Sequence, residues 1–480
     1  MAILIIIISL LTAVVISLIS KRRAVIEYAS VAASFIVFVS AISIGLKVVS
    51  SGSYGFSQYF SVDAFGAIVI IIISLIGFVS CAYSVSYLRE ETTKQIIGFQ
   101  KVKQYFILFN LFILAMFFAA ITSNPIIMWI AIEASTLSTA FLISFYNQPQ
   151  GMEAAWKYLI INSVGLLLGF FGTMLYFTSV ALLDGRQLID WNMLLSNAHN
   201  MDPFVAKIAF IFVLIGYGTK IGFFPMHTWK PDTYSNTPIP IASLFSGALM
   251  NVAFIALLRF KSVTDLAVGQ DFSKELLIFF GLFSIMIAAL IIFIQKSYKR
   301  LLAYSSIEHA GIIALGFGFG GIGAFAAILH MIYHSLAKSI LFLSAGNIFL
   351  RYSSTKIAKI RDAISTIPLT AIIFIIGFLA ITGIPPFGLS LTKFYILSAG
   401  INSHPVITII ALLAFVLVFA GFLKHITYMM FGEKPEEITA GEKNKWLIIP
   451  LVALTIIFIY LSLHLPQFIS ELINSAALNY

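Results

Sequence analysis

Apolar tracts long enough to cross a membrane recur along nearly the whole chain. A helix needs about 20 predominantly apolar residues to cross the hydrocarbon core of a bilayer. We count fourteen such tracts, near residues 2–20, 25–48, 62–86, 104–122, 124–145, 154–178, 204–226, 238–259, 275–294, 302–317, 322–349, 366–396, 404–423 and 446–464. Only 10% of the residues are charged, against roughly 25% in soluble domains. The sequence therefore predicts an all-α integral membrane protein with about 14 transmembrane helices.

The first tract, 2–20, could be mistaken for a secretory signal peptide. No basic residue precedes it and no small-residue cleavage site follows it; the basic run Lys21–Arg23 comes directly after it. We therefore expect a retained first transmembrane helix, with the N-terminus outside the cell.

The distribution of positive charge supports this orientation. If the spans alternate from an outside N-terminus, the cytoplasmic loops receive 19 of the 29 Lys and Arg residues, and the opposite loops receive six. This bias is what the positive-inside rule predicts. It predicts a cell-membrane protein with cytoplasmic basic loops and both termini outside. The net charge of +9 then reflects membrane topology, and we do not expect nucleic acid as a partner.

Several ionisable residues fall within the apolar tracts. A charged side chain at the bilayer centre costs about 2.5–3.5 kcal/mol on insertion scales, so such residues usually serve transport. Helix packing or snorkelling could explain one of them, but not a set spread over six or seven helices. We predict that they form a polar file that translocates protons. The predicted residues are Lys157, Lys220, Lys338, Lys393, Glu133, Glu308, His309, His330 and His334.

The stretch HMIYHSLAK, 330–338, concentrates this signal. His330, His334 and Lys338 are spaced four residues apart, so they share one face of a helix. A neutral imidazole can accept a proton on one nitrogen and release one from the other. The alternative is a metal site at the two histidines, which the absence of a nearby carboxylate in this stretch and the positive charge of Lys338 disfavour.

Two spans carry helix-breaking residues at matching places. Pro225 follows Lys220 in the seventh span, and Pro385–Pro386 precede Lys393 in the twelfth. Proline interrupts a helix, and broken helices at membrane depth line cavities. Interrupted spans in corresponding places also indicate inverted repeats. We predict hinges at these prolines.

The spacing of the breaks predicts how the chain divides. Because spans seven and twelve are five apart, each belongs to a five-helix unit of opposite orientation. We expect N-terminal helices in 1–103, repeats in 104–261 and 262–430, and a C-terminal helix in 431–480. The same offset pairs Lys157 with Lys338 and Glu133 with Glu308.

Motifs for bound cofactors are missing from the sequence. The single cysteine, Cys81, supports no disulfide framework, thiolate metal site or iron–sulfur cluster. GFGFGG at 316–321 matches a nucleotide-binding pattern literally, but it joins two membrane helices instead of following a strand. We expect no cofactor and no catalytic redox centre in this chain.

Three stretches resemble a known family. TKIGFFPMHTWKPDTYSNTPIP, YSSIEHAGIIALGFGFGG and HMIYHSLAKSILFLSAGN are similar to the proton-pumping membrane subunits of respiratory complex I and of Mrp antiporters, and look most like the F component of hydrogenase-four-type membrane complexes. The resemblance spans roughly 60–430. It implies fourteen helices with two inverted repeats and broken helices 7 and 12.

The resemblance also implies roles for individual residues. Glu133 and Lys220 match the carboxylate–lysine pair of the first half-channel, Lys338 with its histidines the central connection, and Lys393 the far half-channel. Two positions depart from the family pattern: Asn251 stands where several relatives have lysine, and Lys393 where some have glutamate.

Three functions remain open at this point. The leading interpretation is a non-redox, ion-pumping subunit of a larger complex, hydrogenase-type or NADH:quinone oxidoreductase-like, whose other membrane and peripheral subunits transfer electrons. The alternative is an Mrp-type Na⁺/H⁺ antiporter subunit without redox partners. A chain that is itself the redox enzyme is a third possibility, which the lack of cofactor motifs disfavours.

Overall fold

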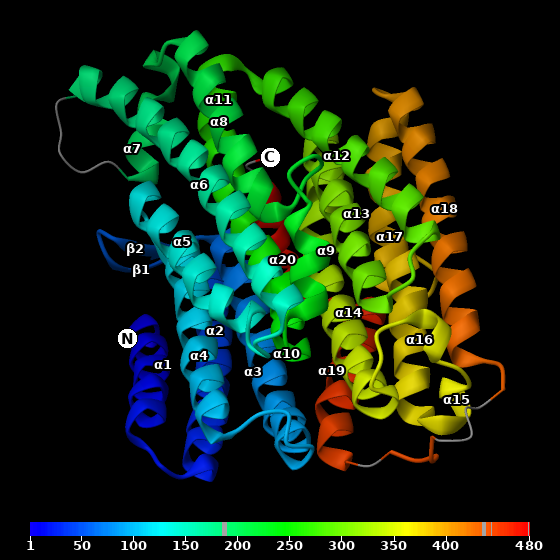
Figure 1. The fold of residues 1–480 in the computed structure, drawn as a ribbon. Helices are drawn as coiled ribbons and strands as arrows, with labels where there is room; N and C mark the ends of the chain where they lie inside the picture. The colour runs from blue at the N-terminus through cyan, green and yellow to red at the C-terminus, as the bar shows by residue number, and fades with distance from the viewer. Residues whose placement is uncertain (185–189, 434–437, 443, 479) are drawn as a thin grey trace.

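The computed structural model describes residues 1–184, 190–433, 438–442, 444–478 and 480. Within these residues, thirteen helices are long and apolar enough to cross a membrane, one of them running without interruption from Ile239 to Val268 through α10, η2 and α11. The remaining predicted tract, the twelfth (366–396), is divided between two shorter helices. Figure 1 shows the long helices running side by side. The predicted all-helical membrane fold is confirmed.

The helices that contain the spans are α1 (Ala2–Ile19), α2 (Arg23–Ser51), α3 (Ala64–Thr93), α4 (Phe99–Ile121), α5 (Pro125–Ile143), α6 (Pro149–Asp184), α8 (Pro203–Ile221), α10 (Ile239–Leu244), η2 (Phe245–Leu249), α11 (Met250–Val268), α12 (Gln270–Phe293), α13 (Tyr298–Phe319), α14 (Ile322–Tyr352), α18 (Pro405–Met430) and α19 (Lys445–Leu463). The shorter elements are β1 (Tyr54–Ser57), β2 (Phe60–Val62), α7 (Trp191–Asn197), η1 (Ala198–Asn200), α9 (Trp229–Asn236), η3 (Ile357–Lys359), α15 (Ala363–Thr366), α16 (Pro368–Thr382), α17 (Gly388–Ile401) and α20 (Gln467–Ala477).

Several short elements lie outside the predicted spans, among them a hairpin and helix α20. Strands β1 and β2 form an antiparallel hairpin between α2 and α3. Helix α20 follows the last span and packs against α3 and α14, and Figure 1 shows it in dark red behind the green helices, near the middle of the view. Both are local additions to an otherwise helical architecture.

Burial separates central helices from lipid-facing ones. The apolar window of α14 is 100% buried and that of α13 is 94% buried, whereas the window of α1 is 33% buried. The two buried helices carry ionisable residues, and such residues in a membrane protein face the interior of the bundle and not the lipid. The stripe of His330, His334 and Lys338 lies on α14, so it occupies the centre of the protein.

Close approach of α6 to α8 depends on glycine. A Cβ atom at Gly216 would lie 2.5 Å from the Cα of Gly169. Membrane helices use such small residues to bring their backbones together. The contact holds α8, which carries Lys220, firmly against α6.

Three lysines depart from the loop positions that the charge count gave them. Lys230 and Lys299 were expected in cytoplasmic loops and Lys261 in an outer loop, but all three are buried. Lys261 forms an ion pair with Asp265 at 2.5 Å. Lys261 and Lys299 lie on helices that extend beyond their predicted apolar tracts. Lys230 lies on α9, the helix that follows the first break. The counted residues Arg186, Lys434 and Lys443 lie outside the described residues.

Candidate functional site

The seventh span is broken as the sequence predicts. Helix α8 ends at Ile221, and Gly222 adopts the left-handed conformation with φ +85°. Glycine takes this conformation without steric cost, which is why it commonly ends helices. Pro225 lies in the segment between α8 and α9, and the chain resumes a helical course at Trp229.

The twelfth span is broken in the same manner. Helix α16 ends at Thr382, Gly383 has φ +87°, and α17 begins at Gly388. Pro385 and Pro386 lie between the two half-helices. Each break therefore consists of a left-handed glycine followed by proline.

Lys220 lies at the end of the first half-helix, in a polar pocket of the first half of the chain. Only 1% of it is exposed. Its Nζ donates hydrogen bonds to Thr136 Oγ1 at 2.6 Å and Tyr158 OH at 2.9 Å. The ammonium also lies 4.8 Å from the centre of the Tyr158 ring. Hydroxyl groups, which can both accept and donate protons, therefore form its immediate surroundings.

Glu133 does not form the direct ion pair with Lys220 that the family resemblance implies. Its Oε1 accepts a hydrogen bond from Ser163 Oγ at 2.8 Å, and its Oε2 is buried without a hydrogen-bond partner among the described residues. The two charges are close enough to interact electrostatically. Thr136, one helical turn from Glu133 on α5, occupies the position next to the ammonium.

The corresponding pair in the second half is in direct contact. Lys393 Nζ lies 3.2 Å from Glu308 Oε1. The same ammonium donates to the carbonyl oxygens of Ile381 at 3.3 Å and Thr382 at 3.4 Å, at the end of α16. Glu308 Oε2 is buried and has no hydrogen-bond partner among the described residues. The carboxylate joins α13 to α17 across the second break.

Three histidines form a cluster beside this pair. His309 Nδ1 and His330 Nε2 are hydrogen-bonded at 2.7 Å, and His330 Nδ1 is hydrogen-bonded to Thr392 Oγ1 at 2.8 Å. The ring of His334 lies 4.9 Å from that of His309, centre to centre. Neither nitrogen of His334 has a hydrogen-bond partner among the described residues.

Lys338 lies one turn beyond His334 on α14. It is fully buried, and its Nζ donates to the carbonyl oxygen of Leu302 at 2.8 Å. Its charge interacts with that of Glu308. The stripe predicted from the sequence is therefore one buried face of α14, which leads from the histidine cluster towards the first half of the chain.

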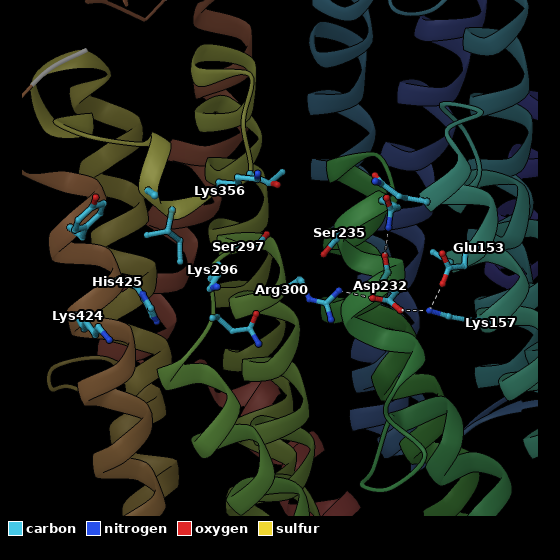
Figure 2. Close-up of a pocket in the computed structure, with 18 residues that line it drawn as sticks. Glu153, Lys157, Asp232, Ser235, Lys296, Ser297, Arg300, Lys356, Lys424 and His425 are labelled. Atoms are coloured by element: carbon cyan, nitrogen blue, oxygen red, sulfur yellow. Dashed lines mark hydrogen bonds and ion pairs between the residues drawn. The ribbon is translucent and has the colours of Figure 1, made fainter.

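Lys157 lies apart from the buried residues with which it was predicted. Its side chain is 46% exposed and forms ion pairs with Glu153 at 2.6 Å and Asp232 at 3.2 Å. Asp232 also pairs with Arg300 at 2.6 Å. Figure 2 shows this network on one side of a cavity, facing Lys424 and His425. The cavity has a volume of about 730 Å³.

Groups at the centre link the two halves. Asn251 Nδ2 donates to Ser335 Oγ at 2.8 Å, which joins α11 to α14. Its Oδ1 is buried without a partner among the described residues, as are the hydroxyl groups of Ser305 and Ser339. Buried polar atoms of this kind are usually satisfied by ordered water. The centre therefore has the chemistry of a hydrated path.

Sequence reasoning missed buried ionisable residues in this region, among them Lys230, which is 1% exposed. It stands in the polar stretch TWKPDTYSN after the first break. The position of Pro225 was the available signal, because a break at membrane depth places the residues after it inside the protein.

The buried file is not arranged as a metal site. Among the described residues, no group of three or more His, Cys, Asp and Glu side chains could hold a metal ion. The hydrogen bond between His309 and His330 instead suits the transfer of protons between imidazole rings.

Comparison with known proteins places the chain in a family. Residues 122–420 match the transmembrane family described as NADH:quinone oxidoreductase/Mrp antiporter. The chain belongs to this family. It is 35% identical over 403 residues to a hydrogenase-4 component F homolog of Methylacidiphilum infernorum (isolate V4), covering 83% of this chain and 84% of that protein.

Solved structures share the fold over the whole chain. A chain of the membrane-bound sulfane sulfur reductase, an archaeal respiratory membrane complex, superimposes with a TM-score of 0.86 at 22% identity, covering 100% of this chain and 96% of that one. A chain of the Mrp complex from Dietzia sp. DQ12-45-1b gives a TM-score of 0.87 at 20% identity, with the same coverage. Both comparisons show the same fold.

Proposed function

We propose that this chain translocates protons across the cell membrane as an antiporter-like subunit of a larger complex, in which partner subunits carry out the electron transfer. The observation that carries the proposal is the series of buried ionisable groups that runs from Lys220 through Lys338 to Glu308 and Lys393. Its members lie on α8, α13, α14 and α17, in both halves of the bundle. Similarity to the hydrogenase-4 component F homolog supports a redox-driven complex.

The chemistry of each group suits a proton relay. Desolvation and a nearby carboxylate act in opposite directions on the proton affinity of a buried lysine. Movement of Glu308 towards or away from Lys393 therefore changes which of them holds a proton. The adjacent imidazoles pass protons between their two ring nitrogens, and Lys338 connects this cluster to the centre.

Glu133 and Lys220 form the corresponding loading site of the first half. Their separation by hydroxyl groups means that a proton must pass through Thr136, Tyr158 or water to move between them. Lys157, in the half-exposed network of Figure 2, sits outside the relay and in a position to exchange protons with solvent.

In this proposal residues 104–261 and 262–430 form two inverted repeats, and each repeat contains one broken helix. The breaks at Pro225 and at Pro385–Pro386 act as hinges, each beside a buried lysine. No cofactor is assigned to the chain, because its buried polar groups suit proton exchange and its relatives are subunits of multi-subunit complexes.

Purification in a mild detergent tests the proposal. We expect hydrogenase-type or NADH-oxidising subunits to co-purify, and the reconstituted complex to acidify or alkalinise the vesicle lumen during redox turnover. Na⁺-dependent proton exchange by an assembly of antiporter subunits alone, without redox partners, would instead support the Mrp-type alternative that the Dietzia structure represents.

Cysteine labelling tests the proposed orientation. We expect Ala358→Cys, in the basic segment between α14 and α15, to react only from the cytoplasm, and Gln58→Cys, at the tip of the β1–β2 hairpin, only from outside. Both positions are exposed, and the single native cysteine, Cys81, is buried, so background labelling is low. Labelling of residue 358 in intact cells by a membrane-impermeant reagent would reverse the orientation.

A further inference from the structure

Lys230 is buried without the oxygen partners that a structural lysine normally has. Its Nζ lies 3.9 Å from the sulfur of Met250 and 6.0 Å from the centre of the Trp229 ring. Among the described residues, Nζ has no ion pair and no hydrogen bond to oxygen. Lys261, also buried, shows the usual arrangement, because Asp265 neutralises it. A buried, unneutralised ammonium is costly unless it exchanges its proton or is hydrated.

The position of Lys230 repeats that of Lys393. Lys393 lies on α17, after the second break, and its side chain covers the left-handed glycine that ends α16: a Cβ at Gly383 would lie 2.9 Å from Lys393 Cδ. Lys230 lies on α9, after the first break, and a Cβ at Gly222 would lie 2.6 Å from its Cδ and 3.0 Å from its Nζ. Each lysine therefore reaches back to the C-terminal end of a half-helix, where the helix dipole favours a cation.

This comparison changes how the two halves correspond. The sequence pairs Lys220 with Lys393 because both stand near a proline. In the structure Lys220 belongs to the half-helix before its break, whereas Lys393 and Lys230 both follow theirs. Lys220 is therefore an additional group of the first half, and Lys230 is the counterpart of Lys393.

Lys230 also lies between the two halves of the file. It interacts electrostatically with both His334 and Lys338 on α14. The side chain of Lys230 contacts Met250, which precedes Asn251 in the sequence. The amide of Asn251 donates a hydrogen bond to Ser335, the residue after His334. His227, in the segment before α9, is the other titratable group that interacts with it. The ammonium thus contacts the residue next to Asn251 and lies within electrostatic range of the stripe on α14.

We propose that Lys230 is the proton carrier that connects the first half of the chain to the His334–Lys338 stripe. This inference rests on the proton-transport function proposed above. The neutral amine takes one proton from a water molecule on the side of Lys220, and the resulting ammonium releases one proton to a water molecule on the side of His334. One proton and one charge move per cycle, and the amine is regenerated.

Substitutions at Lys230 test this role in the assembled complex. We expect Lys230→Met to lower the rate of proton translocation at least tenfold in inverted membrane vesicles, while assembly on native gels is unchanged. Lys230→Arg should fail equally, because guanidinium keeps its proton. Adding Asn251→Lys to Lys230→Met should restore a measurable rate, because residue 251 adjoins the contact of Lys230 and already reaches Ser335.

Matched variants separate charge exchange from packing. Met250→Leu alters the contact of Lys230 without changing a titratable group and should transport normally. Wild-type rates of proton translocation in an assembled Lys230→Met complex would overturn the proposal. Wild-type rates in the Lys230→Arg complex would also overturn it, because they would show that a fixed positive charge is enough for transport. A wild-type complex that moves no protons would instead refute the proposed function and not the role of Lys230 alone.

Discussion

Lys338→Ala is expected to abolish proton translocation while the complex still assembles. The Lys338 ammonium is fully buried and donates to the carbonyl oxygen of Leu302, and it is the ionisable group of α14 that lies beyond the histidines. A positioned proton-transferring side chain typically contributes about 10²–10⁴-fold to a rate, so we expect a loss of at least ~100-fold. Lys338→Met, which fills the same space, should give the same loss.

His334→Ala is expected to have a milder effect. Neither ring nitrogen of His334 is bonded to a described residue, so water that enters the space can replace a neutral relay. Proton uptake by inverted vesicles, followed with a pH-sensitive dye while redox turnover is recorded separately, measures both variants. Ser344→Ala is the matched control on the same helix, because among the described residues Ser344 Oγ donates only to the carbonyl oxygen of Ile340, at 2.7 Å within α14. Normal pumping by Lys338→Ala at unchanged turnover would remove Lys338 from the relay.

Features that depend on periodicity and on backbone chemistry were predictable from the sequence. The spans followed from the length of the apolar tracts, and the shared face of His330, His334 and Lys338 followed from their spacing. The breaks followed from Pro225 and from Pro385–Pro386. These properties are local to one helix, so tertiary packing does not change them.

Contacts between helices were less predictable. The sequence places Glu133 and Lys220 on neighbouring spans, but it does not indicate that Thr136 and Tyr158 take the hydrogen-bonding positions around the ammonium. Direct contact between Glu308 and Lys393 was equally invisible, because side-chain orientation across two helices decides it.

Lys230 and Lys157 were placed in the wrong surroundings for identifiable reasons. Lys230 stands among polar residues and reads as part of a loop, although the break in the span draws that segment into the bundle. Lys157 stands inside a long helix and reads as buried, although Glu153 four residues earlier indicates an exposed i,i+4 ion pair. Hydropathy alone could not separate these cases.

The two carboxylate–lysine pairs should differ in a double-mutant cycle. For Glu308 and Lys393, in contact at 3.2 Å, we expect Glu308→Gln or Lys393→Met alone to destabilise the protein by about 3–5 kcal/mol, the cost of leaving one buried charge unpaired. The double variant should be no less stable than either single variant. This corresponds to a coupling of about 3 kcal/mol or more, at the upper end of the range for residues in contact.

For Glu133 and Lys220, which form no direct ion pair, we expect a smaller coupling. Lys220 keeps its hydrogen bonds to Thr136 and Tyr158 when Glu133→Gln removes the carboxylate, so the effects of Glu133→Gln and Lys220→Met on stability should nearly add. Their effects on transport should not add, because either change alone already removes the loading site. Unfolding in mixed micelles measures stability, and proton uptake by vesicles measures transport. Additive stability losses at Glu308 and Lys393 would show that the contact between them carries no coupling, and the half-channel drawn through that pair would be wrong.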